Sequence, residues 1–214
     1  MKIVPALLAE DFDEFLARLK QAESFTDYVQ IDLMDGSFVP TRSFGPERLN
    51  GLNASLTFEV HLMVQKPSEF LSQITNPKLR KVIFHVEVEE NHSEIIREIE
   101  RRGLTAGIAL KPETGIDDLG DISSRVQSLL FLTVDPCCYG NPFRTEVLDK
   151  VAKARAVFPD KAISVDGGVS LDNLKTFLGI GVDSVCVGSR IFLHGDPKEN
   201  YRRFAERLRE LQGG

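Results

Sequence analysis

The sequence lacks the features that mark three common classes of protein. It has only three cysteines, two of them adjacent at Cys137 and Cys138, and these give neither a disulfide framework nor a CxxC metal spacing. Basic residues are not in excess, since 26 Lys and Arg face 32 Asp and Glu, whereas a binder of nucleic-acid phosphates needs a basic surface. The first apolar stretch ends at Glu10 and Asp11, too early for a signal peptide or a membrane span. We therefore expect a cytoplasmic protein with packed thiols and no nucleic-acid or membrane partner.

The sequence does contain a regular alternation of short β-branched apolar runs and longer amphipathic segments. Its 214 residues, 42% hydrophobic and 27% charged, suffice for one large core, so we expect one domain over residues 1–214. The predicted strands are Ile3–Leu8, Val29–Met34, Thr57–Val64, Lys81–Val86, Thr105–Leu110, Leu129–Val134, Ala162–Val165 and Ser184–Val187. The predicted helices are Asp11–Ala22, Pro67–Gln73, Ser93–Arg102, Thr145–Phe158, Leu171–Leu178 and Lys198–Leu211.

This order of elements predicts an α/β fold in which helices join parallel strands. Eight such units favour a single (β/α)8 TIM barrel, with a doubly wound open sheet as the structural alternative. The connections Gly36–Ser55 and Thr114–Ser128 have room for only a short helix each. In a barrel, the chemistry lies at the C-terminal ends of the strands, so the residues there are the first candidates for a site.

Three of these strand ends carry side chains that can do chemistry. Asp32 ends the second strand among apolar neighbours, His61 ends the third, and Asp166 follows the seventh. Each alone could be a satisfied polar core group, but three converging titratable groups indicate a site. His85 and Glu87 alternate inward on the fourth strand, as a buried structural pair or as outer partners of that site.

Glycines at the last two strand ends indicate an anion site. Gly167 and Gly168 follow the seventh strand, and Gly188 and Ser189 follow the eighth, each before a helix-prone segment. Either pair could be only a tight turn. Together, in the two units where barrels commonly bind phosphate, they predict a phosphate site made of backbone N–H groups.

These residues and their neighbours resemble the ribulose-phosphate 3-epimerase family over nearly the whole chain. The matching stretches are Pro5–Phe12, Asp32–Pro40, Phe44–Pro46, Val60–Val64, Gly107–Thr114, Val134–Pro136, Val165–Val169 and Val187–Ser189. The resemblance implies a barrel of the ribulose-phosphate-binding type that interconverts ribulose 5-phosphate and xylulose 5-phosphate by proton transfer at carbon 3. It also implies a sugar-phosphate partner and a homo-oligomer.

The resemblance assigns roles to residues of this chain. Asp32 and Asp166 would be the acid and base. Asp32, His61 and Asp166, with Gln30 as a further candidate, would bind a divalent metal, which could be zinc, manganese or magnesium. The substrate- and phosphate-binding candidates are Ala6, His61, Met63, Lys111, Gly140, Gly167, Gly168, Gly188 and Ser189.

The sequence departs from the family pattern at several of these positions. Gln30 stands where the family has a metal-binding histidine, and an amide oxygen is a weaker zinc ligand than imidazole. Ala6 replaces a serine that contacts the substrate, and the usually glycine-rich loop after the sixth strand keeps Gly140 alone. Lys111 replaces an asparagine, and its ammonium could substitute for metal charge beside an enediolate or could simply balance a carboxylate.

These departures leave two alternatives to the epimerase. Lys111 favours a lyase or decarboxylase of the phosphate-binding barrels. Gln30, Ala6 and the altered loop favour a paralogue that binds a sugar phosphate without turning it over, although the retention of both aspartates speaks against that reading.

Overall fold

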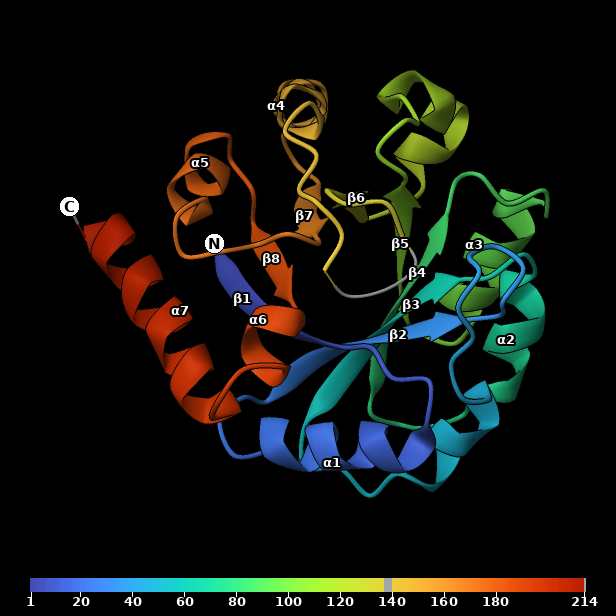
Figure 1. The fold of residues 1–214 in the computed structure, drawn as a ribbon. Coiled ribbons are helices and arrows are strands. Elements are labelled where there is room, and N and C mark those ends of the chain that lie inside the picture. The colour runs from blue at the N-terminus through green and yellow to red at the C-terminus, as the bar shows by residue number, and fades with distance from the viewer. Residues whose placement is uncertain (137–139, 214) are drawn as a thin grey trace.

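Eight parallel strands form a closed barrel in the computed structural model, which describes residues 1–136 and 140–213 (Figure 1). The strands are β1 (Lys2–Leu7), β2 (Tyr28–Met34), β3 (Thr57–Met63), β4 (Leu79–His85), β5 (Thr105–Leu110), β6 (Ser128–Leu132), β7 (Ala162–Asp166) and β8 (Ser184–Val187). Each strand pairs with the next, and β8 closes the barrel against β1. The predicted (β/α)8 barrel is therefore confirmed, and the open-sheet alternative is wrong.

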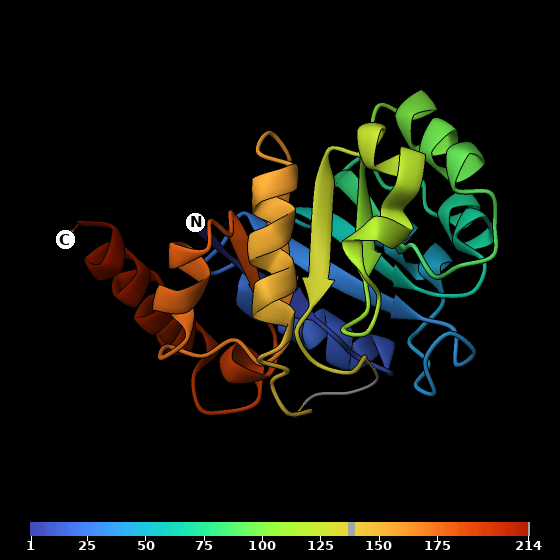
Figure 2. The ribbon, with the colours of Figure 1, turned by 90° about the horizontal axis from the view of Figure 1, so that it is seen from above.

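Helices lie around the outside of the barrel, as two perpendicular views show (Figures 1 and 2). They are α1 (Phe12–Ala22), α2 (Pro67–Gln73), α3 (His92–Arg101), α4 (Val147–Val157), α5 (Leu174–Gly179), α6 (Ser189–Phe192) and α7 (Pro197–Gly213). The two connections with room for a short helix hold the 3-10 helices η1 (Pro46–Gly51) and η2 (Ile116–Ser124). No helix of the residues that the structure describes is long and apolar enough to cross a membrane.

The strands divide their side chains between two packed regions because successive residues point to opposite faces. The outward side chains pack under the helices in one large core, whose biggest fully buried members include Phe15, Phe58, Phe84, Phe131 and Phe177. A smaller cluster fills the barrel interior and consists of Val4, Ala6, Ile83, Ala109, Leu130 and Cys186.

The strand register determines which polar residues meet. Asp32 of β2 lies beside His61 of β3, and Asp166 of β7 lies beside Cys186 of β8. Gln30 pairs with Ala6 of β1, one inward position below Asp32. The candidate residues therefore gather at the C-terminal end of the barrel, as expected for this fold.

Candidate active site

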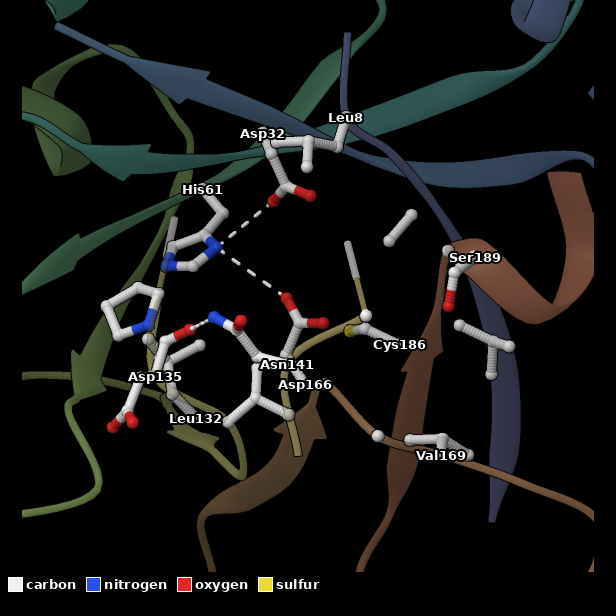
Figure 3. Close-up of a pocket in the computed structure, with 18 of the residues that line it drawn as sticks. Leu8, Asp32, His61, Leu132, Asp135, Asn141, Asp166, Val169, Cys186 and Ser189 are labelled. Carbon is white, nitrogen blue, oxygen red and sulfur yellow. Dashed lines mark hydrogen bonds and ion pairs between the residues drawn. The ribbon is translucent and has the colours of Figure 1, made fainter. Parts of the chain in front are cut away.

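Two carboxylates converge on one histidine at the centre of the site (Figure 3). His61 Nδ1 lies 3.1 Å from Asp32 Oδ1 and 3.7 Å from Asp166 Oδ2. The His61 side chain is fully buried and that of Asp32 is nearly so, whereas the Asp166 side chain keeps 15% of its surface exposed. The structure thus brings together the three groups that the sequence singled out.

The amide group of Gln30 links the same two carboxylates from below. Its Nε2 donates to Asp32 Oδ1 at 2.8 Å and to Asp166 Oδ2 at 2.6 Å. The buried thiol of Cys186 donates to Gln30 Oε1 at 3.1 Å. Sequence spacing alone does not connect Cys186 with the site, because Cys186 and Gln30 lie 156 positions apart in the chain.

A row of hydrogen bonds leads from His61 to the barrel mouth. His61 Nε2 lies 2.9 Å from His85 Nε2, and His85 Nδ1 lies 2.9 Å from Glu87 Oε2. Glu87 Oε1 also accepts from the backbone N–H of Lys111 at 2.7 Å. His85 and Glu87 are therefore outer partners of the central histidine, one of the two readings that the sequence allowed.

The electrostatics of this row favour a charged His61 and a neutral His85. Burial alone would lower the pKa of His61, but the hydrogen bond and charge of Asp32 raise it above its ordinary value. Burial lowers the pKa of His85 to about 4. Burial would raise the pKa of Glu87, but the hydrogen bond with His85 lowers it to about 2. His61 can then donate from both ring nitrogens, to Asp32 and to His85.

The two aspartates differ in their surroundings, and Asp166 is the carboxyl group that retains a proton. Burial, followed by the negative charge of Asp32, raises the pKa of Asp166 to about 7, against the opposing charge of His61. Two carboxyl groups this close cannot easily both be ionised. Below about pH 7 the pair therefore carries one proton that can be transferred.

The donor types at this centre suit a divalent cation, except for Gln30. Asp32, His61 and Asp166 each offer a ligand atom within 4.8 Å of the others, the one such group among the residues that the structure describes. These carboxylate and imidazole ligands fit zinc or manganese. Gln30, however, turns its N–H donors toward the carboxylates, and an N–H group has no lone pair for a metal.

A cavity of about 200 Å³ opens above the three central residues. Its lining includes most of the predicted substrate- and phosphate-binding residues, namely Ala6, His61, Met63, Gly140, Gly167, Gly168, Gly188 and Ser189. Gly167 has a φ of +99°, which other residues rarely adopt, and a Cβ there would lie 2.4 Å from Val134 Cγ2. The strand-end glycines thus shape the cavity wall.

Two predicted residues do not line this cavity. Gln30 lies beneath it, and Lys111 extends its Nζ to 4.0 Å from the ring centroid of Phe38. Conversely, Asp135, Asn141 and Arg190 line the cavity although none of them is among the site residues that the sequence predicts. The predicted packing of Cys137 and Cys138 lies outside the described residues.

The fold and the site define a (β/α)8 barrel with a carboxylate pair and a histidine at its C-terminal face. A model of the ribulose-phosphate 3 epimerase family matches residues 2–192, and the chain belongs to that family of carbohydrate epimerases. It is 31% identical to ribulose-phosphate 3-epimerase of Schizosaccharomyces pombe, over 92% of this chain and 90% of that protein. It is 32% identical to ribulose-phosphate 3-epimerase of Helicobacter pylori, over 92% and 94% of the two chains.

Solved structures of lower identity show the fold alone. Phosphoribosyl anthranilate isomerase from Thermococcus kodakaraensis superposes with a TM-score of 0.67 at 13% identity, over 97% of this chain and 98% of that one. Orotidine 5'-monophosphate decarboxylase from Sulfolobus solfataricus gives a TM-score of 0.64 at 15% identity, over 99% of each chain. Because one barrel carries such different chemistries, the function must be argued from the site.

Proposed function

We propose that this protein is a ketose-phosphate epimerase that interconverts ribulose 5-phosphate and xylulose 5-phosphate. The observation that carries the proposal is the pair Asp32 and Asp166, which share one cavity and hold one proton below about pH 7. An epimerase that exchanges a proton between two faces of a carbon needs one basic and one acidic group at the start. Membership of the family supports the same substrate class.

The proton transfer at carbon 3 then takes two steps. Asp32, which accepts hydrogen bonds from His61 and Gln30, removes the proton as a carboxylate, and the C–H electron pair becomes part of an enediolate. Asp166 donates its proton to carbon 3 from the other face, which inverts the configuration. Asp32 ends protonated and Asp166 ionised, so the reverse reaction starts with the roles exchanged.

Positive charge beside the cavity stabilises the enediolate. His61 supplies it as an imidazolium whose Nδ1 faces both carboxylates. A divalent cation held by Asp32, Asp166 and a neutral His61 would supply this charge in place of the imidazolium, and zinc, manganese and magnesium are the ions to test.

The phosphate group would lie at the opposite side of the cavity, against Gly167, Gly168, Gly188 and Ser189. Backbone N–H groups at such strand ends can donate to phosphate oxygens. A side chain at Gly167 would meet Val134, so a glycine keeps this wall open. Ala6, Met63 and Gly140 would contact the sugar from the remaining walls.

We also propose that residues 1–214 act as one barrel domain in a homo-oligomer. A cytoplasmic location is proposed with it, supported by a relative from Oryza sativa named as a cytoplasmic isoform, which is 30% identical over 92% of this chain.

The test is an assay with ribulose 5-phosphate in deuterated water, with and without zinc, manganese or magnesium. We expect xylulose 5-phosphate that carries deuterium at carbon 3, because the donated proton comes from a group that exchanges with solvent. Absence of both product and exchange under every condition would reject the proposal and favour the sugar-phosphate-binding paralogue. Release of carbon dioxide or cleavage of a carbon–carbon bond would favour the lyase, for which the position of Lys111 over Phe38 gives no support.

A further inference from the structure

Gln30 is built into the base of the site as a bridge between the two aspartates. Its side chain is fully buried, and both of its N–H groups are used, one for each carboxylate. Asp32 and Asp166 come from β2 and β7, so the amide joins two distant strands of the barrel. A side chain that merely filled space would need no donors here.

The orientation of the amide is set by its third contact. The Cys186 thiol donates to Gln30 Oε1, and burial raises the pKa of this thiol well above its usual value, so it keeps its proton. An amide turned by 180° would place Oε1 against the Asp32 carboxylate oxygen, so that two acceptors would face each other with no proton between them. It would also leave the thiol facing an N–H group, so the observed orientation is the stable one.

We propose that the Gln30 amide takes the place of a bound divalent cation in holding Asp32 and Asp166 together, so that a cation is dispensable for the reaction. The catalytic half of this inference, that the reaction needs no cation, rests on the proposed epimerase function. The metal-binding half, that the Gln30 amide occupies the place of a cation, does not. The N–H donors of Gln30 enter the space between the carboxylates, where a cation would need a lone pair instead. Cys186 is a positioning residue, since it acts through Gln30.

Zinc titration of the metal-free protein tests the metal-binding half without reference to activity. The variants are Gln30→His, which supplies an imidazole in the site, and Gln21→His, which supplies one on the exposed side of α1 as the matched control. We expect Gln30→His to bind one zinc ion about 10- to 100-fold more tightly than the wild type, because even the loss of an indirect partner of a metal ligand changes the affinity by that factor. Gln21→His should bind zinc as the wild type does. A wild-type protein that holds one zinc as tightly as Gln30→His would overturn the proposal.

Cys186 provides a second, subtler comparison. Cys186→Ala removes the donor to Oε1 and frees the amide to turn its oxygen toward a cation, whereas Cys186→Ser keeps a donor. We expect the alanine variant to bind zinc about tenfold more tightly than the serine variant, which should match the wild type. Equal affinities in all three proteins would show that the thiol does not set the amide, and would contradict the proposal.

The catalytic half is tested by deuterium exchange at carbon 3 after dialysis against a chelator. We expect the wild type to keep its exchange rate and Gln30→Leu, which lacks both donors, to lose rate with little change in KM and to show a displaced pH profile. A purely structural Gln30 would alter the melting temperature but leave the pH profile in place. Exchange by the wild type that disappears with the chelator and returns with zinc refutes this half, whereas no exchange under any condition refutes the proposed function and leaves the zinc titrations decisive.

Discussion

The proton shared by Asp32 and Asp166 predicts a pH limit for the reaction. Turnover in either direction needs the singly protonated pair, with one carboxyl group as acid and the other as base. Burial and the charge of Asp32 raise the pKa of Asp166 to about 7, so the last proton of the pair leaves near that pH. Above pH 7 the active fraction, and with it kcat/KM, should fall about tenfold for each pH unit, because each unit removes nine-tenths of the remaining protonated form.

The raised pKa of Asp166 also makes the free energy of unfolding depend on pH. The folded protein binds this proton more tightly than the unfolded chain, whose aspartate has a pKa near 3.8. The stabilisation that Asp166 contributes is therefore complete below that pH and is lost as the pH rises through about 7. Circular dichroism at each pH is needed to separate loss of the acid from loss of the fold.

The assay is the initial rate of deuterium incorporation at carbon 3, measured from pH 5.5 to 9 with the fold monitored in parallel. Asp166→Asn, which has no proton to donate, should lose about 10²- to 10⁴-fold in rate, the usual contribution of a general acid. A rate for the wild type that stays constant from pH 7 to 9 in a folded protein would refute the reasoning, because the pair would then not depend on a proton that leaves near neutrality.

Three further predictions concern the surroundings of this pair. Gly167→Ala should destabilise the protein by about 1–2 kcal/mol for its positive φ, and by more in the presence of Val134 than in a Val134→Ala background, as chemical denaturation of the four proteins would show. Lys111→Met should leave kcat within about twofold, since Nζ packs over Phe38 and outside the cavity lining, and a much larger loss would restore the idea that its charge reaches the enediolate. The pKa of His85 is lowered to about 4, so its contribution to stability is present above pH 6.5 and is lost as the pH falls toward 4. Melting temperatures measured from pH 7 to 4 should therefore decline, and His85→Phe should make that decline smaller.

The fold could be predicted because its signal is repeated along the whole chain. Eight β-branched runs separated by amphipathic segments define the barrel, and the two short connections were recognisable because they lack room for a full helix. The period of two along a strand then identified Asp32 and His61 as inward residues, and the barrel rule brought Asp166 to the same end. These inferences need only the local sequence and the closure of the sheet.

The contacts that decide the chemistry could not be predicted in the same way. Whether Gln30 turns its oxygen or its nitrogen toward the aspartates depends on the Cys186 thiol of β8. From the sequence, this cysteine is expected only to pack in the core. Lys111 follows an inward-facing strand, but its side chain extends over the ring of Phe38, beside the outer partners of the site and not in the cavity lining. Side-chain direction at the end of a strand depends on neighbours that the strand period does not specify.

The positions of the hydrogens along the row from Asp32 to Glu87 show that His61, like Gln30, presents N–H groups to the aspartate pair. With Glu87 ionised and His85 neutral, His85 donates to Glu87 and can only accept from His61, so His61 must donate on that side. His61 then also donates toward Asp32, and a ring with both nitrogens protonated is a cation without a free lone pair. A charged His61 and a donating Gln30 thus present hydrogens, rather than lone pairs, to the two carboxylates. Both side chains that bond the aspartate pair are thereby arranged to hold carboxyl groups and their shared proton, which is the arrangement that a two-carboxylate proton exchange requires.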